Sequence, residues 1–188
     1  DKLTTGAPFF VEMGHSQPST LSPEIKNAIS AVAIAANKAL GIINGPSHTE
    51  IIVTNEGPKI VEVGARLGGD NITTRLVPLS TGVNLVENCI RWAMGEKVVI
   101  QKTYDRAAVI RYFKCGSGQI ESIDGIDRFR GDLDINELTF TKGVGDFVSE
   151  IKNSTDRIGF VICSGGDIDN VVTKCNEVIN SIKITVTP

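Results

Sequence analysis

The sequence predicts an α+β protein built from two modules. Three amphipathic helix patterns and a series of short strand-like runs share the chain, and the runs become dominant after residues 96–102. The 188 residues, 41% of them hydrophobic and 22% charged, are enough for one substantial core or two small ones. We therefore expect one module at residues 1–99 and a second at residues 100–188.

The first module is expected to open with a short strand over residues 8–13 and a polar turn at residues 15–19. A helix then begins at Pro23, where proline suits the first helical position and Ser22 can cap the free backbone N–H groups. Apolar side chains recur at spacings of three and four along this helix, and Gly41 can close it.

A β-hairpin and a second helix complete the first module. The strand-like runs His48–Thr54 and Lys59–Ala65 are separated by Asn55-Glu56-Gly57-Pro58, whose composition is typical of a hairpin turn. The Gly-rich residues 66–71 follow, and a helix is expected from Gly82 to Met94, with one apolar side buried.

The second module is predicted to consist mainly of strands. Its expected elements are strands at residues 107–113, 118–123, 137–141 and 157–163, a helix at residues 167–182, and a final strand at residues 183–187. Glycine and aspartate residues separate the strands, as expected for turns.

Composition and charge exclude several classes of function. The formal net charge of −3, without a Lys/Arg cluster, does not suit a nucleic-acid partner or a membrane surface. No apolar run approaches the roughly 18 residues that span a bilayer, and the four cysteines lack metal-ligand spacing. We expect a soluble, cytoplasmic protein with free thiols. The first residue, Asp1, is not a methionine, which suggests a part of a longer protein.

The hairpin carries the first group of chemically suggestive residues. With a three-residue loop over residues 55–57, Thr54 pairs with Pro58, and Glu50 then lies directly opposite Glu62. A loop one residue longer or shorter would send the two carboxylates to opposite faces.

Two like charges opposite each other need a cation or an exposed position. A hard ion such as Mg²⁺ fits, because it binds through one or two carboxylates together with substrate phosphates. Alternation along the strand puts Gly64 and Arg66 on the face of Glu62, and Arg66 can reach a phosphate with two donors. The alternative is a solvated hairpin face with scattered charges.

These residues resemble a known family. His48-Thr49-Glu50-Ile51-Ile52 and Glu62-Val63-Gly64-Ala65-Arg66-Leu67-Gly68-Gly69-Asp70 look like the metal-binding hairpin of ATP-grasp ligases. Residues 10–18 (FVEMGHSQP) and 45–50 (GPSHTE) are similar to the L-amino-acid ligase branch, which joins two amino acids or related acids and amines with ATP. Residues 108–113 and 156–161 resemble the small C-terminal domain of those ligases, so the resemblance covers essentially the whole chain.

The resemblance implies roles for individual residues of the hairpin. Glu50 and Glu62 would hold the Mg²⁺ (or Mn²⁺) ions that bridge the phosphates of the co-substrate ATP. Arg66 would steady the transferred phosphoryl group, and Gly69 would offer a backbone N–H close to it. Many ATP-grasp enzymes have an asparagine two residues after the second glutamate, and Gly64 stands there in this sequence. The departure removes one side-chain ligand from the second metal position.

The resemblance also implies a substrate site and a reaction. Glu12 and His15 would line the pocket of an amino-acid substrate. The fold would be the C-terminal lobe of an ATP-grasp domain, an antiparallel sheet with helices, followed by a small α+β domain. The reaction is phosphoryl transfer to a carboxylate and attack of an amine on the acyl phosphate.

The lysine-bearing nucleotide lobe and the Gly-rich loop of ATP-grasp enzymes are not recognisable in this sequence. We therefore expect a C-terminal fragment of a carboxylate–amine ligase that is inactive by itself. Two alternatives remain open: a fragment of another ATP-grasp enzyme, either carbamoyl-phosphate-synthase-like or a purine-pathway ligase, and a non-catalytic binding module that reuses the fold. A homodimer is compatible with each of them.

Overall fold

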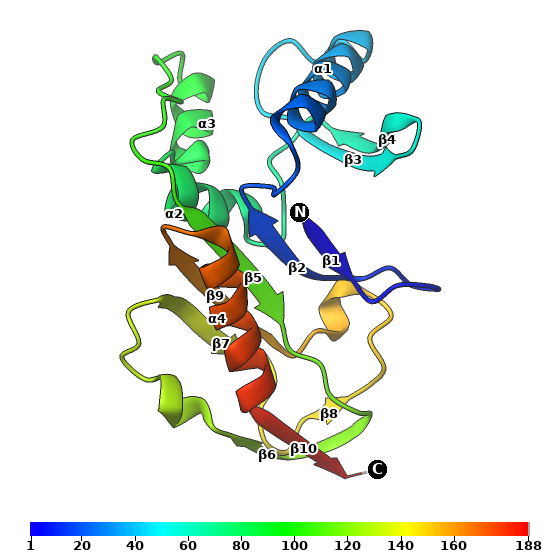
Figure 1. Ribbon diagram of the computed structural model, residues 1–188, viewed down its shortest axis with the longest axis vertical. Helices are drawn as coiled ribbons and strands as arrows, with labels where there is room; N and C mark the ends of the chain where they lie inside the picture. Colours follow the sequence, from blue (N-terminus) through cyan, green and yellow to red (C-terminus); the bar gives the residue numbers. More distant parts are fainter. Residues whose placement is uncertain (188) are drawn as a thin grey trace. The chain divides into compact units, whose positions relative to one another are not determined.

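The computed structural model describes residues 1–187, which fall into two compact units (Figure 1). Unit 1 contains Asp1–Pro18 and Tyr104–Pro188, and unit 2 contains Ser19–Thr103. The chain therefore leaves unit 1 after β2 and returns to it a few residues beyond the single boundary that the sequence predicts. The first 18 residues join the strands of the predicted second module.

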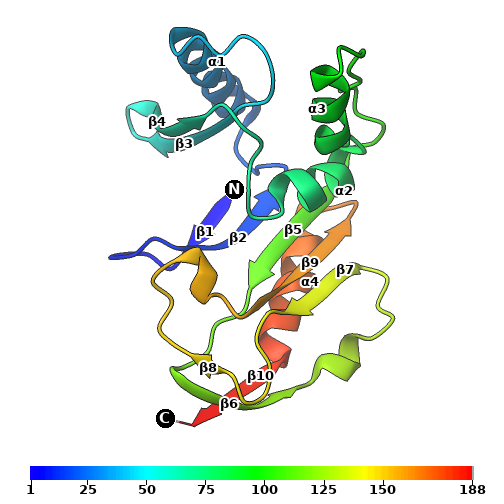
Figure 2. The ribbon, with the colours of Figure 1, turned by 180° about the vertical axis from the view of Figure 1, so that it is seen from behind.

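Unit 1 is built on an antiparallel sheet with the strand order β1-β2-β5-β9-β7. These strands are β1 Lys2–Thr4, β2 Glu12–Gln17, β5 Ala107–Tyr112, β9 Gly159–Gly165 and β7 Ile135–Phe140. Helix α4, Ile168–Ser181, crosses one face of this sheet, as the two opposite views show (Figures 1 and 2). A second sheet pairs β10 Lys183–Thr187, β6 Gly118–Asp124 and β8 Phe147–Val148, and the 3₁₀ turns are η2 Ile126–Phe129 and η3 Ser154–Asp156.

The core of unit 1 lies between α4 and the sheet. Asp167 caps α4 by accepting from the backbone N of Asn170 at 2.9 Å. The apolar stripe of the helix then buries Val171, Cys175 and Val178 against β5 and β9. Burial of this kind, at about 25 cal/mol per Å² of apolar surface, is what fixes the helix on the sheet. The predicted helix and its buried stripe are confirmed here.

Unit 2 combines a long helix, a hairpin and a run of shorter helices. Its elements are α1 Pro23–Ala39, β3 His48–Thr54, β4 Gly57–Gly64, the π-helical turn η1 Ile72–Leu76, α2 Val77–Thr81 and α3 Leu85–Ala93. Helix α1 begins as predicted, with the Ser22 hydroxyl accepting from the backbone N of Ile25 at 3.4 Å and Pro23 in the first turn. It packs against the β3–β4 hairpin.

The structure corrects the start of the chain. The predicted strand at residues 8–13 is confirmed only at residues 12–13, because Phe10 has a left-handed φ of 48° and β2 begins at Glu12. The predicted polar turn at residues 15–19 is also wrong over its first half, since β2 continues to Gln17. The reason is tertiary: residues 14–17 pair with β5, and this pairing outweighs their polar composition.

The second predicted helix also differs from expectation. Asn84 caps α3, which starts three residues later than predicted. The helical segments η1 and α2 precede it and are not among the predicted elements. Within the described residues, neither α1 nor α3 has a buried side chain, so the apolar side expected to be buried on α3 is not. No helix in residues 1–187 is both long and apolar enough to cross a membrane.

Candidate functional site

The β3–β4 hairpin places Glu50 directly opposite Glu62, which confirms the predicted pairing. The predicted turn is nevertheless wrong. Thr54 pairs with Gly57 and not with the proline after it, so the loop contains only residues 55–56. Such a shortened loop, taken alone, would have sent the two carboxylates to opposite faces.

A β-bulge restores the register. Ile51 pairs with Ile60 and Glu50 pairs with Glu62, which leaves Val61 as an extra residue between the two pairs. A bulge of this kind shifts the following residues by one position and so returns them to the other face. The two carboxylates share a face because of this bulge rather than because of the turn.

The carboxylates lie on the face of the hairpin that points away from α1. Asn37 of α1 donates from Nδ2 to the Oγ1 of Thr49 at 3.1 Å, so Thr49 faces the helix. Successive residues of a strand point to opposite faces, which turns Glu50 and its partner Glu62 away from α1. The Glu62 side chain is 57% exposed, and that of Glu50 is partly buried.

Each carboxylate meets a basic side chain on the same face. The Nη2 of Arg66 lies 3.3 Å from the Oε1 of Glu62, and the Nε2 of His48 lies 3.5 Å from the Oε1 of Glu50. Arg66 lies close over Gly64, because a Cβ at that position would stand 3.2 Å from the Cγ of Arg66 and would require a small shift of the arginine. The arginine thus folds back over the glycine, into space that an asparagine side chain would need.

This donor set fits a hard divalent cation only in part. Within residues 1–187, no group of three or more His, Cys, Asp or Glu side chains could hold a metal ion. Mg²⁺ normally binds proteins through one or two carboxylates and takes its other ligands from water and phosphate oxygens. Glu50 and Glu62 match that pattern if a phosphate supplies the remaining ligands, and Gly64 adds none.

Gly69 lies in the loop that follows β4. Its carbonyl accepts from the backbone N of Ile72 at 2.8 Å, and the next two residues, Asp70 and Asn71, have left-handed φ angles of 50° and 61°. These features fix the loop directly after the carboxylate-bearing strand and lead it into η1. A contact between the Gly69 N–H and a phosphate stays a prediction.

The residues predicted to bind substrate lie on β2, in unit 1. His15 pairs with Lys2, but Glu12 pairs with Thr4, because a bulge at Met13 shifts the register. Lys2 and Thr4 are two positions apart and share a face, so the bulge brings Glu12 and His15 onto one face although three positions separate them. The 3.2 Å contact between the Lys2 Nζ and the Glu12 Oε1 agrees with this placement.

Two arginines that the sequence analysis did not single out hold the backbone of β2. The Nη1 of Arg111 donates to the carbonyl of His15 at 3.1 Å, and the Nη1 of Arg157 donates to the carbonyl of Glu12 at 3.0 Å. A signal for Arg111 was available, because it interrupts the otherwise apolar run of β5. Arg157 carries no comparable signal.

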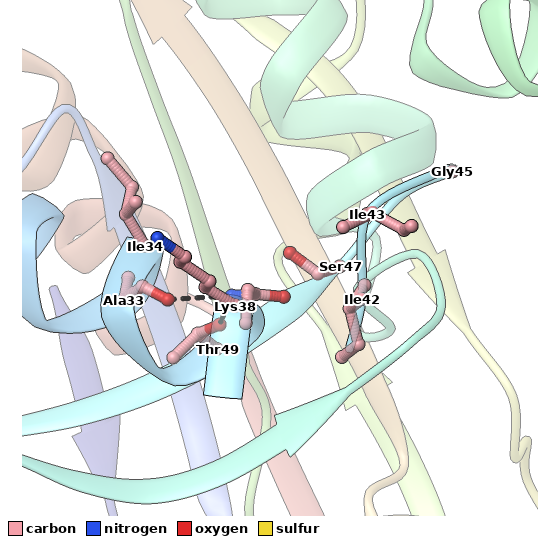
Figure 3. Close-up of a pocket in the computed structure, with 9 residues that line it drawn as sticks. Ala33, Ile34, Lys38, Ile42, Ile43, Gly45, Ser47 and Thr49 are labelled. Atoms are coloured by element: carbon pink, nitrogen blue, oxygen red, sulfur yellow. Dashed lines mark hydrogen bonds between the residues drawn. The ribbon is translucent and has the colours of Figure 1, made fainter. Parts of the chain in front are cut away.

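A hollow of about 500 Å³ lies between α1 and the segment that leads into β3 (Figure 3). Its walls are mainly apolar and include Ile34 of α1 and Ile42 and Ile43 of the connecting segment, with Lys38 and Ser47 as polar groups. Thr49 also lines it, and therefore it opens on the α1 side of the hairpin. The hollow does not belong to the carboxylate face.

Comparisons with known proteins find relatives in sequence. Residues 111–187 match the family model of the L-amino acid ligase C-terminal domain 2. Protein y4rH from Sinorhizobium fredii is 29% identical over 182 residues, which cover 96% of this chain and 38% of y4rH. Alanine–anticapsin ligase from Bacillus subtilis is 41% identical over 64 residues, which cover 34% of this chain and 14% of the ligase. The chain thus spans well under half the length of these relatives.

Solved structures share the fold over nearly the whole chain. A phosphoribosylglycinamide synthetase from Anaerococcus prevotii matches with a TM-score of 0.84 and 25% identity, over 99% of this chain and 48% of that one. An L-amino acid ligase from Bacillus licheniformis matches with a TM-score of 0.83 and 26% identity, over 96% and 46%. The biotin carboxylase domain of Hydrogenobacter thermophilus 2-oxoglutarate carboxylase, solved with MgADP, has the same fold, with a TM-score of 0.65 and 18% identity over 93% of this chain and 39% of that one.

The family match covers residues 111–187, whereas the fold matches extend over nearly the whole chain, including the hairpin. Residues 111–187 match the L-amino acid ligase C-terminal domain 2, and the chain as a whole has the fold of the C-terminal region of ATP-grasp enzymes.

Proposed function

We propose that this chain is the C-terminal part of an ATP-dependent carboxylate–amine ligase that joins amino acids or related acids and amines. The observation that carries the proposal is the pairing of Glu50 with Glu62 on one open face of the hairpin, with Arg66 beside them. The family match at residues 111–187 supports the amino-acid branch.

The residues of the hairpin suit the demands of phosphoryl transfer, which are mainly positioning and neutralisation of charge. ATP bound with Mg²⁺ or Mn²⁺ would supply the phosphoryl group that activates the substrate carboxylate. Glu50 and Glu62 would hold the ion, and Arg66, at 3.3 Å from Glu62, would then turn its guanidinium to the phosphate. Gly69 would offer its backbone N–H in the adjoining loop.

Substrate recognition is assigned to β2 of unit 1. Glu12 and His15 share one face of that strand, where a carboxylate can pair with an ammonium group and an imidazole can bond a polar group of an amino acid. The proposal includes three further points: the substrates are amino acids, the protein is cytoplasmic, and it forms a homodimer.

A purine-type ligase is the second candidate, since the phosphoribosylglycinamide synthetase structure matches the chain with a TM-score of 0.84. The two candidates differ in the amine substrate. A panel of amino acids, compared with a phosphorylated ribosylamine plus glycine, separates them directly.

The test uses the complete ligase to which we assign the chain. We expect phosphate release that requires two amino acids, ATP and Mg²⁺, and a loss of most turnover in Glu62→Gln. Glu56→Gln is the matched control, because Glu56 lies in the same hairpin but pairs with Lys59 at 3.0 Å, outside the site. ATP hydrolysis indifferent to every amino acid would contradict the amino-acid assignment, and full activity of Glu62→Gln would contradict the metal assignment.

A further inference from the structure

We infer that Arg111 and Arg157 are positioning residues for the amino-acid site, because together they fix the backbone of β2 on either side of the bulge that brings Glu12 and His15 onto one face. The inference rests on the proposed function and adds that the C-terminal domain positions the strand that binds the substrate. Both arginines lie within the residues that match that domain.

Arg157 holds the first half of β2. Glu12 lies beyond the last pair of the β2–β5 ladder, so its carbonyl has no partner from β5 in that ladder. The Nη1 of Arg157 donates to this carbonyl at 3.0 Å, and its Nε donates to the carbonyl of Ser154 at 2.8 Å. The guanidinium also lies 3.8 Å from the centre of the Tyr112 ring. Two further contacts, to Ser154 and to Tyr112, therefore hold the guanidinium that bonds Glu12.

Arg111 holds the second half of β2. Its Nη1 donates to the carbonyls of His15 and Ile110, at 3.1 and 2.9 Å, and its Nη2 donates to the Oγ of Ser16 at 3.0 Å. The residue is only 9% exposed, and burial lowers the pKa of its guanidinium. Gly14 gives it room, because a Cβ there would stand 2.8 Å from the Cδ of Arg111. The buried guanidinium of Arg111 therefore donates hydrogen bonds to β2 and to the neighbouring strand β5.

The two arginines approach β2 from opposite faces of the sheet. Arg111 shares its face of β5 with Val109, which belongs to the core under α4. Tyr112 is the next residue and therefore points to the opposite face. Its ring contacts the guanidinium of Arg157. The strand is therefore held from both sides.

The face that carries Arg157 is also the proposed substrate face. His15 pairs with Ile110, and Ile110 shares a face of β5 with Tyr112. A bulge increases the local twist and interrupts the ladder, so the side chains of Glu12 and His15 depend on additional contacts for a single orientation. Misplacement of such groups by about 1 Å can cost a rate factor of about 100.

The first experiment measures kinetics in the complete ligase. Arg157→Lys and Arg111→Lys keep the charge but lose the planar fork that makes these contacts. We expect the KM of the amino-acid substrate to rise about 10-fold or more, and the KM of ATP to change less than about 2-fold. Arg130→Lys is the control, since Arg130 pairs with the exposed Asp127 at 2.9 Å, away from β2.

The second experiment measures structure in the 188-residue chain. The chain contains two histidines, so the imidazole NMR signals of His15 and His48 are easily told apart. Either arginine variant should shift the His15 signal while His48 and the circular dichroism spectrum stay unchanged. If Arg111→Lys does not fold, the partly exposed Arg157 still provides the test.

Two results would overturn the inference: an unmoved His15 signal in a folded variant, or equal increases in both KM values, which would make the arginines merely structural. A complete protein without amino-acid-dependent turnover would instead refute the proposed function. The NMR result would still decide whether the arginines hold β2.

Discussion

At the scale of single residues, the carboxylate pair of the hairpin brings two like charges close together. Glu50 and Glu62 face each other, and like charges in that position repel. Arg66, 3.3 Å from Glu62, offsets part of the repulsion, but a pair this exposed contributes only about 0–1 kcal/mol. The folded state therefore gains little from having two glutamates here.

The first prediction follows from this balance. Glu50→Gln should change the free energy of unfolding of the chain by less than about 1 kcal/mol, or raise it slightly, because a repulsive pair is removed. In the complete ligase with ADP, the same change should weaken Mn²⁺ binding about 10-fold or more, because a carboxylate ligand is lost. Urea unfolding and electron paramagnetic resonance measure the two effects, with Glu56→Gln as control. A parallel loss of stability and metal binding would mark the pair as structural.

The second prediction concerns the substrate face of β2. In the complete ligase, Glu12→Ala or His15→Ala should raise the KM of an amino-acid substrate about 10-fold and leave the KM of ATP nearly unchanged, because each removes a polar contact to the substrate alone. Steady-state kinetics with each substrate varied in turn measures this split. Glu121→Ala, an exposed change in the other sheet of unit 1, is the control. Equal effects on both constants would argue for a structural role.

At the scale of elements, the sequence predicts best where local chemistry decides. Ser22 and Pro23 mark the start of α1, and Asp167 marks the start of α4. The two bulges, at Met13 and Val61, are not predictable in this way, because each arises from the way one strand pairs with another. The pairing of the two hairpin glutamates was predicted from a turn that is one residue too long, and the unforeseen bulge compensates for the error.

The residues of the candidate site differ in the same way in how far the sequence predicts them. The residues of the hairpin, Glu50, Glu62 and Arg66, are close in sequence and carry a local motif, so they could be named in advance. Arg111 and Arg157 reach β2 across separations of 96 and 145 residues. The apolar run around Arg111 marks that residue as unusual, but the strand that each arginine contacts depends on the completed sheet.

The third prediction tests how α4 is anchored. Lys174 of α4 lies 2.7 Å from Asp132, and this hydrogen bond holds the pKa of Asp132 below its ordinary value of 3.8. A folded-state pKa below the ordinary value means that the stabilisation is complete above pH 3.8 and is lost as the pH falls through the lowered value. Asp132→Asn should therefore lower the free energy of unfolding by about 0.5–1 kcal/mol at pH 7.

In urea titrations at decreasing pH, this difference from the parent should shrink once the pH is below 3.8. Asp127→Asn provides the control, because Asp127 forms an exposed pair with Arg130 away from α4. A difference that persists unchanged at acid pH would show that the ion pair is not its source.

At the scale of the whole molecule, unit 2 carries more apolar surface than a self-contained unit would. Ile34 is 69% exposed and Ile43 is 83% exposed, and neither α1 nor α3 buries a side chain among the described residues. Extended apolar surface usually marks a site of interaction. The solved structures that match are about twice as long as this chain, and we propose that the rest of the ligase covers this surface in the complete protein.

The fourth prediction concerns the chain by itself. We expect it to fold, because the core of unit 1 is closed, and to release no phosphate from ATP above background, because no nucleotide lobe is recognisable in it. A coupled phosphate assay with Mg²⁺ and mixed amino acids measures turnover, and circular dichroism monitors folding. Turnover by the folded chain would show that these 188 residues hold a whole nucleotide site.

Unit 2 is inserted between two strands that are neighbours in one sheet, since Gln17 of β2 pairs with Ala108 of β5. Closing that pair requires the intervening chain to form a loop, and the entropy of loop closure grows only with the logarithm of length. Each doubling costs about 0.6 kcal/mol. The sheet that holds β2 can therefore tolerate large changes in the length of the inserted unit. Unit 2 can therefore change in length while the strand that carries Glu12 and His15 keeps its place.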